Sequence, residues 1–189
     1  MEELFQSVWD VFKNRASVRS FAEKEVSEES IDFLLRCAET APSSGNMQPA
    51  EFIIIRNDQM KQRIVECTFI GYFSKGGEHQ SWIREAPVVI VACANQKRTK
   101  ARYGETGKEW SIIDTSAAVE NLIVAASGVG LASCWVGGFN EVKLKEHLSI
   151  PSFVKPIGVI PIGHPKGNVE RKSRLRQEII RHNEQYHND

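Results

Sequence analysis

The sequence lacks an excess of charge of either sign and any long apolar run. Its 24 Lys and Arg residues are balanced by 24 Asp and Glu residues, so the formal net charge at pH 7 is zero. This balance gives no support to a general role in binding nucleic acid or a membrane surface. The amino-terminal residues MEELFQSVWDVFK carry acids where a signal peptide needs bases, and no apolar stretch of membrane-spanning length follows. We therefore expect a soluble, cytoplasmic protein.

Clustered metal ligands and closely spaced cysteines are also absent. The four cysteines are far apart, and each lies in an apolar or amphipathic stretch: Cys37, Cys67, Cys93 and Cys134. No two of them form a CxxC knuckle, and the five histidines show no HExxH spacing. This pattern argues against a structural zinc ion or a disulfide framework and favours buried free thiols. We expect no metal site.

Common nucleotide-binding and hydrolase motifs are missing as well. A dinucleotide-binding fingerprint needs GxGxxG between a strand and a helix. The glycines here come after a predicted helix and around a predicted strand: Gly128, Gly130, Gly137 and Gly138. No P-loop occurs, and no Ser-His-Asp or Cys-His arrangement can be recognised. If the protein is an enzyme, we expect a cofactor to carry the chemistry.

The 189 residues have the composition of one globular domain, spanning 1–189. Apolar periodicity and capping residues predict helices at 3–14, after the N-cap Ser27, at 58–67, just before Glu85, at Asp114–Val129 with Gly130 as its cap, and at Glu141–Leu148. Strands are predicted at Glu51–Arg56, 88–94, Ala132–Val136 and Ile157–Ile162. Glycines 71, 76 and 77 mark a loop, and residues 95–111 have no clean period, as in a mobile lid. The interleaved order by itself favours a parallel α/β sheet.

Three polar clusters are candidates for ligand binding. The first is Arg15-Ala-Ser17-Val-Arg19, in a segment expected to be extended. Alternation along an extended chain would direct its three polar side chains to one side. Two guanidinium groups and a hydroxyl suit a phosphate, although a solvated surface is the alternative.

The other two clusters lie in loops. The run APSSGNMQP at 41–49 combines hydroxyls, amides and stiffening prolines, and it could bind a flat polar ligand edge or form an ordinary turn. The run RKSRLR at 171–176 contains four basic residues. It could be a solvated face, a nucleic-acid patch, or the second half of a phosphate clamp with Arg15 and Arg19.

The order of these motifs resembles that of the nitroreductase family of flavoproteins. RxSxR near the start is followed by APSSxNxQP, a DxxAAxxNL helix, a glycine turn after a CW strand, PIGHP and finally KSR. The resemblance covers nearly the whole chain and is most specific in Pro42–Pro49 and Asp114–Gly138. It implies an α+β fold with a mixed, mainly antiparallel sheet flanked by helices. It also implies an extended carboxyl tail that wraps onto the partner of a homodimer.

The same resemblance implies an FMN site shared between two subunits. Arg15, Ser17, Lys172 and Arg174 would bind the phosphate and ribityl chain, with Arg19 nearer the N1–C2 edge of the ring, where positive charge stabilises the anionic reduced flavin. A partner subunit would supply five further residues: Pro42, Ser43, Ser44, Asn46 and Gln48. Gly137 and Gly138 match the turn whose backbone N–H faces flavin N5. No side chain is implied as a catalytic acid or base.

The implied activity is transfer of two electrons from NAD(P)H to a small acceptor by a ping-pong mechanism. Nitroaromatics, quinones and free flavin are the expected acceptors. The alternatives are a specialised reaction on the same fold, such as reductive dehalogenation or azoline oxidation, a flavin-binding or redox-sensing protein with little turnover, and RNA binding through the basic tail.

Several assignments stay open at this stage. Any of His79, Gln80 and Trp82 could contact the flavin ring. Tyr103 and Trp110 could stack near the flavin or simply pack in the interior. A basic group in residues 95–111 could attract the 2′-phosphate of NADPH or form a solvated loop: Lys97, Arg98, Lys100 and Arg102.

Overall fold

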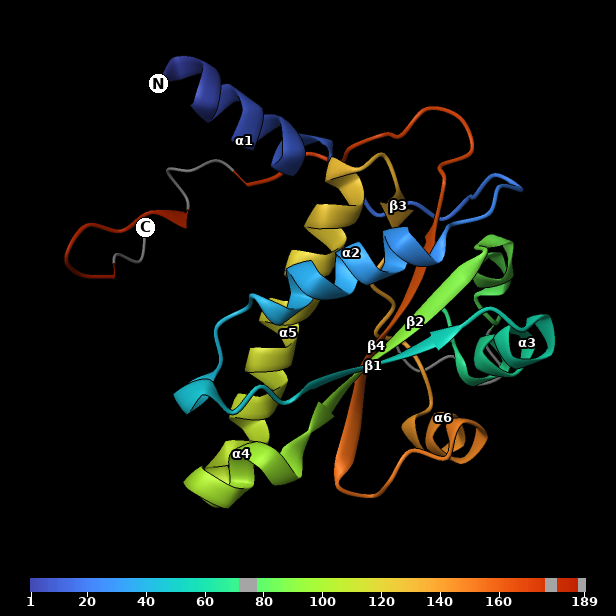
Figure 1. The fold of residues 1–189 in the computed structure, drawn as a ribbon, viewed down its shortest axis with the longest axis vertical. Helices are drawn as coiled ribbons and strands as arrows, with labels where there is room; N and C mark the ends of the chain where they lie inside the picture. The colour runs from blue at the N-terminus through green and yellow to red at the C-terminus, as the bar shows by residue number, and fades with distance from the viewer. Residues whose placement is uncertain (72–77, 176–179, 187–189) are drawn as a thin grey trace.

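A four-stranded antiparallel sheet forms the centre of the fold (Figure 1). The structure is a computed structural model, and it describes residues 1–71, 78–175 and 180–186. The strand order is β1-β2-β4-β3, where β1 is Ala50–Ile55, β2 is Val88–Asn95, β4 is Val154–Gly163 and β3 is Ala132–Ser133. The register pairs Ile54 with Ile90 and Val91 with Val159.

The strand directions confirm the mixed, mainly antiparallel sheet that the family resemblance implies. The parallel sheet favoured by the interleaved element order is therefore wrong. All three strand pairs are antiparallel, and the bridge between Ser17 and Ser133 is the parallel pairing within the described part of the chain. Element order alone does not fix strand direction, because a long helical connection can return the chain along either direction.

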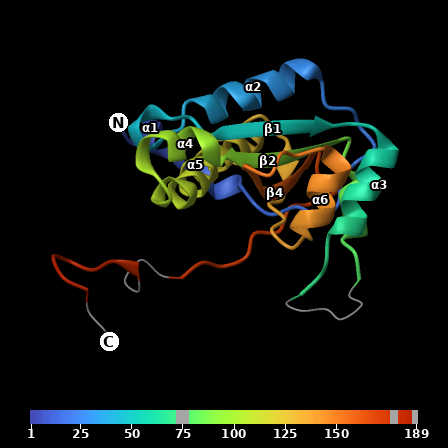
Figure 2. The same cartoon turned by 90° about the horizontal axis from the view of Figure 1, so that it is seen from below.

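Strand β2 is buried on both faces, which explains its unbroken apolar sequence. Val88, Ile90 and Ala92 pack in one core with helices α2 (Glu28–Glu39) and α5 (Thr106–Gly128). Val89 and Val91 pack in a second core with α3 (Asp58–Cys67) and α6 (Glu141–Leu148). Figure 2 shows α2 on one side of the sheet and α6 on the other. Alternation along one strand therefore joins two helical layers.

Residues 96–103 and 106–111 are helical although residues 95–111 have no clean apolar period, and a role as a mobile lid stays a prediction. They form α4 (Gln96–Tyr103) and the first turns of α5, which begins eight residues before the predicted start. Their order comes from tertiary contacts and not from an apolar stripe. A Cβ added at Gly107 would lie 2.7 Å from the Thr99 carbonyl oxygen, so glycine permits close contact between α4 and α5. The Tyr103 and Trp110 rings pack on each other with centroids 4.8 Å apart, which favours the packing interpretation of this pair.

The other elements follow the sequence pattern closely. Ser27 caps α2 by accepting a hydrogen bond from the Ser30 N–H, and the short helix before Glu85 is η2 (Ser81–Glu85). After α5, Gly130 adopts φ 76°, and the Leu131 N–H donates to the Ala126 carbonyl, which completes a Schellman cap. The predicted strand Ala132–Val136 is interrupted, with β3 at its start and only a bridge to β4 at Val136. The predicted loop glycines 76 and 77 lie outside the described residues.

The two ends of the chain cover little of the core. Helix α1 (Glu2–Asn14) is amphipathic as predicted, yet none of its residues is buried. It contacts α5 and leaves five large apolar side chains more than half exposed: Leu4, Phe5, Val8, Trp9 and Phe12. The described tail beyond Gly167 runs away from the sheet (Figure 2). None of the helices in the described ranges is both long and apolar enough to cross a membrane.

Candidate functional site

The first polar cluster lies in an extended segment at the β3 edge of the sheet, as predicted. Ser17 bridges Ser133, and the Val18 N–H donates to the Ser133 carbonyl at 2.9 Å. Phe21 pairs with Pro165, beyond the end of β4. The segment is therefore held between β3 and the chain that leaves β4.

The Ser17 side chain contacts the buried thiol of Cys134. Burial raises the pKa of this thiol, and the positive charge of Arg19, a hydrogen bond with Ser17 and the charge of Arg15 oppose that rise. The charges of Arg19 and Arg15 act on this thiol through space, whereas Ser17 bonds to it. Arg15 lines a cavity beside the segment and Ser17 and Arg19 do not, so the sequence argument that alternation directs all three to one side stays a prediction.

Positive charges without acidic partners gather around a cavity beside this segment. The cavity has a volume of about 430 Å³, and Lys13, Arg15 and Arg171 line it together with Ser133. None of these three cations belongs to an ion pair among residues 1–71, 78–175 and 180–186. We call it the cationic cavity. Its donors and unbalanced charge fit a phosphate group.

Arg171 is a residue of this cavity that sequence reasoning did not single out. It belongs to the predicted basic run, and its guanidinium lies 6.0 Å from the centre of the Trp9 ring. Lys172 and Arg174 do not line the cavity; both are exposed. Arg174 donates a long hydrogen bond, 3.5 Å, to the Lys172 carbonyl. Within one chain, the described tail therefore brings Arg171 to Arg15 and leaves Lys172 and Arg174 outside.

The glycine turn lies at the far end of the same strand segment. A Cβ at Gly137 would meet nothing within 4 Å, whereas one at Gly138 would lie 2.9 Å from the Phe69 carbonyl oxygen. Gly137 is four positions beyond Ser133, which is about 13 Å of extended chain. A phosphate site and an open backbone turn therefore lie along one edge, as an elongated ligand with a phosphate at one end requires.

Of the three residues left open, Gln80 lies against this turn. Its Nε2 donates to the Phe69 carbonyl at 3.0 Å and would lie 3.6 Å from a Cβ at Gly138. His79 contacts the Thr68 carbonyl through Nδ1 at 2.7 Å. Trp82 packs against Phe21 in the interior. Arg19 lies 5.8 Å from the centre of the Trp82 ring.

The Pro42–Pro49 loop is fixed by contacts with α5 and α4. Both carboxylate oxygens of Asp114 accept hydrogen bonds from Ser44, one from its backbone N–H and one from its hydroxyl, each at 3.0 Å. The Ser43 hydroxyl oxygen accepts from the Gln48 N–H at 3.0 Å. An ordinary solvated turn would not need a buried carboxylate to hold it. Asp114 was recognised in the sequence only as part of a helix motif, because 70 residues separate it from Ser44.

The basic group in α4 contacts this loop instead of forming a free cationic surface. Arg98 donates to the Gln48 carbonyl and pairs with Glu51, both at 2.7 Å. Arg102 donates to the Gly45 carbonyl at 3.1 Å. The two lysines also have partners, since Lys100 pairs with Glu105 and Lys97 lies over the Phe153 ring. These contacts give the group a structural role, and attraction of a nicotinamide 2′-phosphate stays a prediction.

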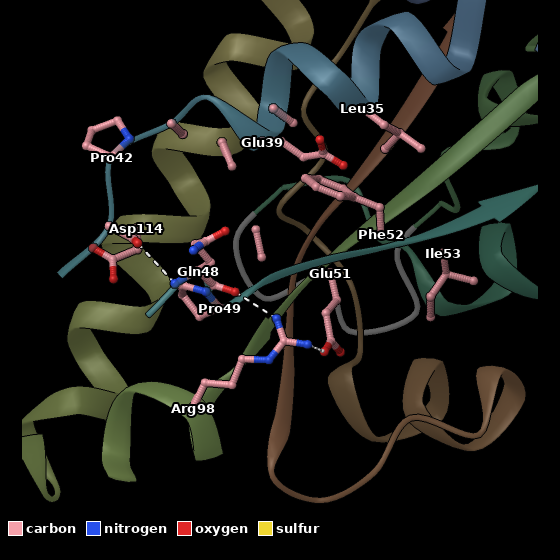
Figure 3. A pocket seen from close by; sticks show the side chains of 15 residues that line it. Leu35, Glu39, Pro42, Gln48, Pro49, Glu51, Phe52, Ile53, Arg98 and Asp114 are labelled. Carbon is pink, nitrogen blue, oxygen red and sulfur yellow. Dashed lines mark hydrogen bonds and ion pairs between the residues drawn. The ribbon is translucent and has the colours of Figure 1, made fainter. Parts of the chain in front are cut away.

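A second cavity of about 570 Å³ lies behind the Pro42–Pro49 loop (Figure 3). Leu35 and Phe52 form part of its apolar wall, and Asp114 lines it from α5. Figure 3 shows the Arg98 side chain bonded to Glu51 and to the loop at the edge of this cavity. The cavity lies against the loop and not beside the cationic cavity. Among the described residues, no group of three or more His, Cys, Asp or Glu side chains could hold a metal ion.

The loop and the Arg15–Arg19 segment lie at different levels along α5 (Figure 1). Ser44 contacts Asp114, near the start of the helix, whereas Ser17 pairs with Ser133, just beyond its end. Fourteen residues of helix from Asp114 to Gly128 span about 21 Å. One chain therefore does not bring the first two predicted clusters together. A second copy of the chain would have to supply one of them to a common ligand.

Comparisons with known proteins agree with this architecture. The sequence model of the Nitroreductase family matches residues 12–164. The FMN reductase of Bacillus subtilis, whose name gives NAD(P)H as its reductant, is 30% identical over 202 residues, covering 100% of this chain and 76% of that protein.

Solved structures give the same result. The chain is similar to a nitroreductase family protein from Clostridium novyi, with 31% identity, a TM-score of 0.74, and coverage of 84% of this chain and 85% of that one. It is also similar to NfrA2 of B. megaterium, with 25% identity, a TM-score of 0.83, and coverage of 97% and 76%. The chain therefore belongs to the nitroreductase family.

Proposed function

We propose that this protein is an FMN-dependent oxidoreductase that carries two electrons from NAD(P)H to a small acceptor by a ping-pong mechanism. One observation carries the proposal: the cationic cavity, which Ser133 lines, and the open space at Gly137 lie along the same extended segment. Family membership and the FMN reductase relative support FMN as the group that fits this edge. Bound there, FMN would supply the two-electron chemistry, and the protein would supply binding, orientation and charge.

The phosphate end of the site would be held by charge-assisted hydrogen bonds. Arg15 is the donor that the extended segment contributes to the cationic cavity, and the tail adds Arg171. Ser17 does not line this cavity, and we propose that its hydroxyl contacts the ribityl chain beside the phosphate. In our proposal Lys172 and Arg174 join them when the tail packs in the dimer. Such bonds are the strong ones for phosphate, because a guanidinium presents several donors in a fixed plane.

The ring end would be shaped by the glycine turn. The free space at Gly137 allows a flat ring to approach the backbone N–H, and this donor would serve N5. Arg19 would place positive charge near the N1–C2 edge, which favours the anionic reduced form. Gln80, bonded to Phe69 beside the turn, is our candidate for the pyrimidine edge.

A homodimer would complete each site. The separation along α5 means that Pro42, Ser43, Ser44, Asn46 and Gln48 have to come from the second copy if they contact the same FMN. The exposed apolar face of α1 supports such an interface, because a monomer seldom leaves a contiguous apolar patch uncovered. We propose that the carboxyl tail wraps onto this partner.

Rapid mixing of the purified, FMN-loaded protein with NADH or NADPH tests the proposal. Loss of the flavin absorbance at a rate consistent with turnover, followed by recovery on addition of a quinone or a nitroaromatic compound, is the expected result. Flavin that binds but is not reduced would indicate a flavin-binding or redox-sensing protein. Reduction without reoxidation by these acceptors would favour a specialised reaction such as dehalogenation. A colourless protein that cannot be reconstituted with FMN would overturn the proposal and leave RNA binding by the tail as the rival.

A further inference from the structure

The contact between Asp114 and Ser44 is unusual because a buried carboxylate serves one loop residue alone. Asp114 is only 8% exposed, and its two oxygens accept from the two donors of Ser44. Within the described part of the chain, no ion pair includes Asp114. Burying a charge is costly unless hydrogen bonds compensate for it. The two bonds from Ser44 are the compensation that the structure provides.

The loop around Ser44 has a conformation that needs such support. Gly45, Asn46 and Gln48 have φ values of 55°, 58° and 46°, in the left-handed region. Non-glycine residues there are strained, and they persist where surrounding contacts hold the backbone. Arg98 and Arg102 hold two loop carbonyls from α4, and Asp114 holds Ser44 from α5.

The carboxylate also fixes the direction in which the Ser44 hydroxyl can bond. An ionised carboxylate has no proton to give, so the hydroxyl must donate its single proton to Asp114. Only lone pairs then remain on the Ser44 oxygen, and it can bind a ligand only by accepting a hydrogen bond. Ser43 has the opposite character, because its oxygen accepts from the Gln48 N–H and its proton stays available to donate.

We propose that Asp114 is a positioning residue that makes the Ser44 hydroxyl an acceptor for an uncharged donor of the cofactor. This inference rests on the proposed function, in which the Pro42–Pro49 loop contacts FMN. A phosphate oxygen offers no proton, so Ser44 would contact a ribityl hydroxyl or the N3–H group of the ring. The phosphate would then be left to the arginines of the other copy.

Fluorescence titration of the apoprotein dimer with FMN, and separately with riboflavin, tests this inference. Ser44→Ala should weaken both ligands by the same factor, about tenfold, because the lost bond does not involve the phosphate. Asp114→Asn should weaken the binding of both ligands to a similar extent. The amide of the new Asn can donate a hydrogen bond to the Ser44 oxygen, and the Ser44 hydroxyl would then direct its own proton towards the ligand instead of a lone pair. The double variant should bind like Ser44→Ala alone, which is the signature of two coupled residues.

Glu39→Gln is the matched control, because Glu39 is a carboxylate that lines the cavity behind the loop without bonding to Ser44. This control should bind both ligands as the wild type does. If the losses of binding free energy in the two single variants add up in the double variant, Asp114 acts only by supporting the loop, and the inference is overturned. If Ser44→Ala weakens the binding of FMN but not the binding of riboflavin, the inference is overturned as well.

Different results would overturn the proposed function and the inference about Asp114. Wild-type protein that binds neither ligand would overturn the proposed function and this inference together. Wild-type binding that is unaffected by Asp114→Asn would overturn the inference alone. Thermal unfolding of each variant shows whether it folds, and Ser44→Ala keeps the backbone bond to Asp114, so the ligand comparison stands even if Asp114→Asn is unstable.

Discussion

The arginines of α4 and the arginines of the cationic cavity differ in what their charges contact. Arg98 and Arg102 are engaged by carbonyl and carboxylate oxygens of their own chain. Arg15 and Arg171 line the cationic cavity, and no ion pair among the described residues includes either. Similar residues therefore have different roles, and only the second pair is available for a ligand.

Replacing Arg15 with Ala should weaken FMN binding selectively. A hydrogen bond to a charged group contributes roughly 1.5–3 kcal/mol, so the affinity should fall about ten- to a hundredfold. Riboflavin lacks the phosphate, so its affinity should barely change, and Arg174→Ala should behave alike if the tail completes the site. Fluorescence titration provides the measurement, and Arg36→Ala on the exposed surface of α2 is the control. Equal weakening of both ligands would mean that Arg15 acts through folding or the interface.

Substituting Ala at two glycines should separate binding from stability. Gly137→Ala places a methyl group in open space, so we expect unchanged thermal unfolding and weaker FMN binding. Gly107→Ala places its methyl group 2.7 Å from the Thr99 carbonyl oxygen. It should cost about 1–3 kcal/mol of stability, as overpacking does. Calorimetry and FMN titration of both variants give the comparison, and a Gly137→Ala protein that binds FMN normally would rule out close approach at this turn.

Buried thiols should make stability depend on alkaline pH. Burial raises the pKa of the Cys93 thiol to about 12, from its ordinary value of 9.0. Below pH 9.0 the thiol is protonated in both the folded and the unfolded protein. Between pH 9.0 and about 12 the thiol loses its proton in the unfolded protein but keeps it in the folded protein. The free energy of unfolding therefore falls as the pH rises through this range. Urea unfolding at about pH 8 and about pH 10.5 should show a smaller decline for Cys93→Ala than for the wild type. Equal declines would contradict a buried, protonated Cys93.

Secondary-structure elements with strong local signals could be predicted from the sequence, and those held by distant contacts could not. Ser27, the apolar run of β2 and the Gly130 cap each specify an element within a few residues. Helix α4 is polar, and its order depends on packing against α5, so the sequence of residues 95–111 does not indicate it. The candidate site divides in the same way. The Arg15–Arg19 segment is extended as predicted, whereas the bonds from Asp114 to Ser44 join residues 70 positions apart.

On the scale of the whole molecule, we propose that the site is complete only in a dimer. Two features point to this conclusion. The apolar face of α1 is exposed, and α5 separates the Pro42–Pro49 loop from the Arg15–Arg19 segment by about 21 Å, at a rise of about 1.5 Å per residue. Obligate dimers often have no stable monomer, so we expect analytical ultracentrifugation to find FMN only in the dimer. A flavin-loaded monomer would refute the shared site.

Mixing two defective variants should restore binding. Arg15→Ala and Ser44→Ala subunits, unfolded and refolded together in equal amounts, would form heterodimers in which one site carries both substitutions and the other carries neither. Random assembly would make roughly a quarter of all sites intact, because a twofold dimer has two equivalent sites. Titration with limiting FMN should reveal this fraction as a wild-type affinity class. Its absence from the mixture, with each homodimer as control, would show that both residues serve the same site within one chain.

The length of α5 sets the distance between the Pro42–Pro49 loop and the Arg15–Arg19 segment of the same chain. Each helical residue adds about 1.5 Å and about 100° of rotation. Deleting one residue between Asp114 and Gly128 would therefore rotate Asp114 and the start of the helix by about 100° relative to the end of the helix, which lies beside Ser133. An insertion or deletion of a few residues near Gly71, in a surface loop, carries no such geometric consequence. Length variation should thus be tolerated in the loops of this protein and excluded from its central helix.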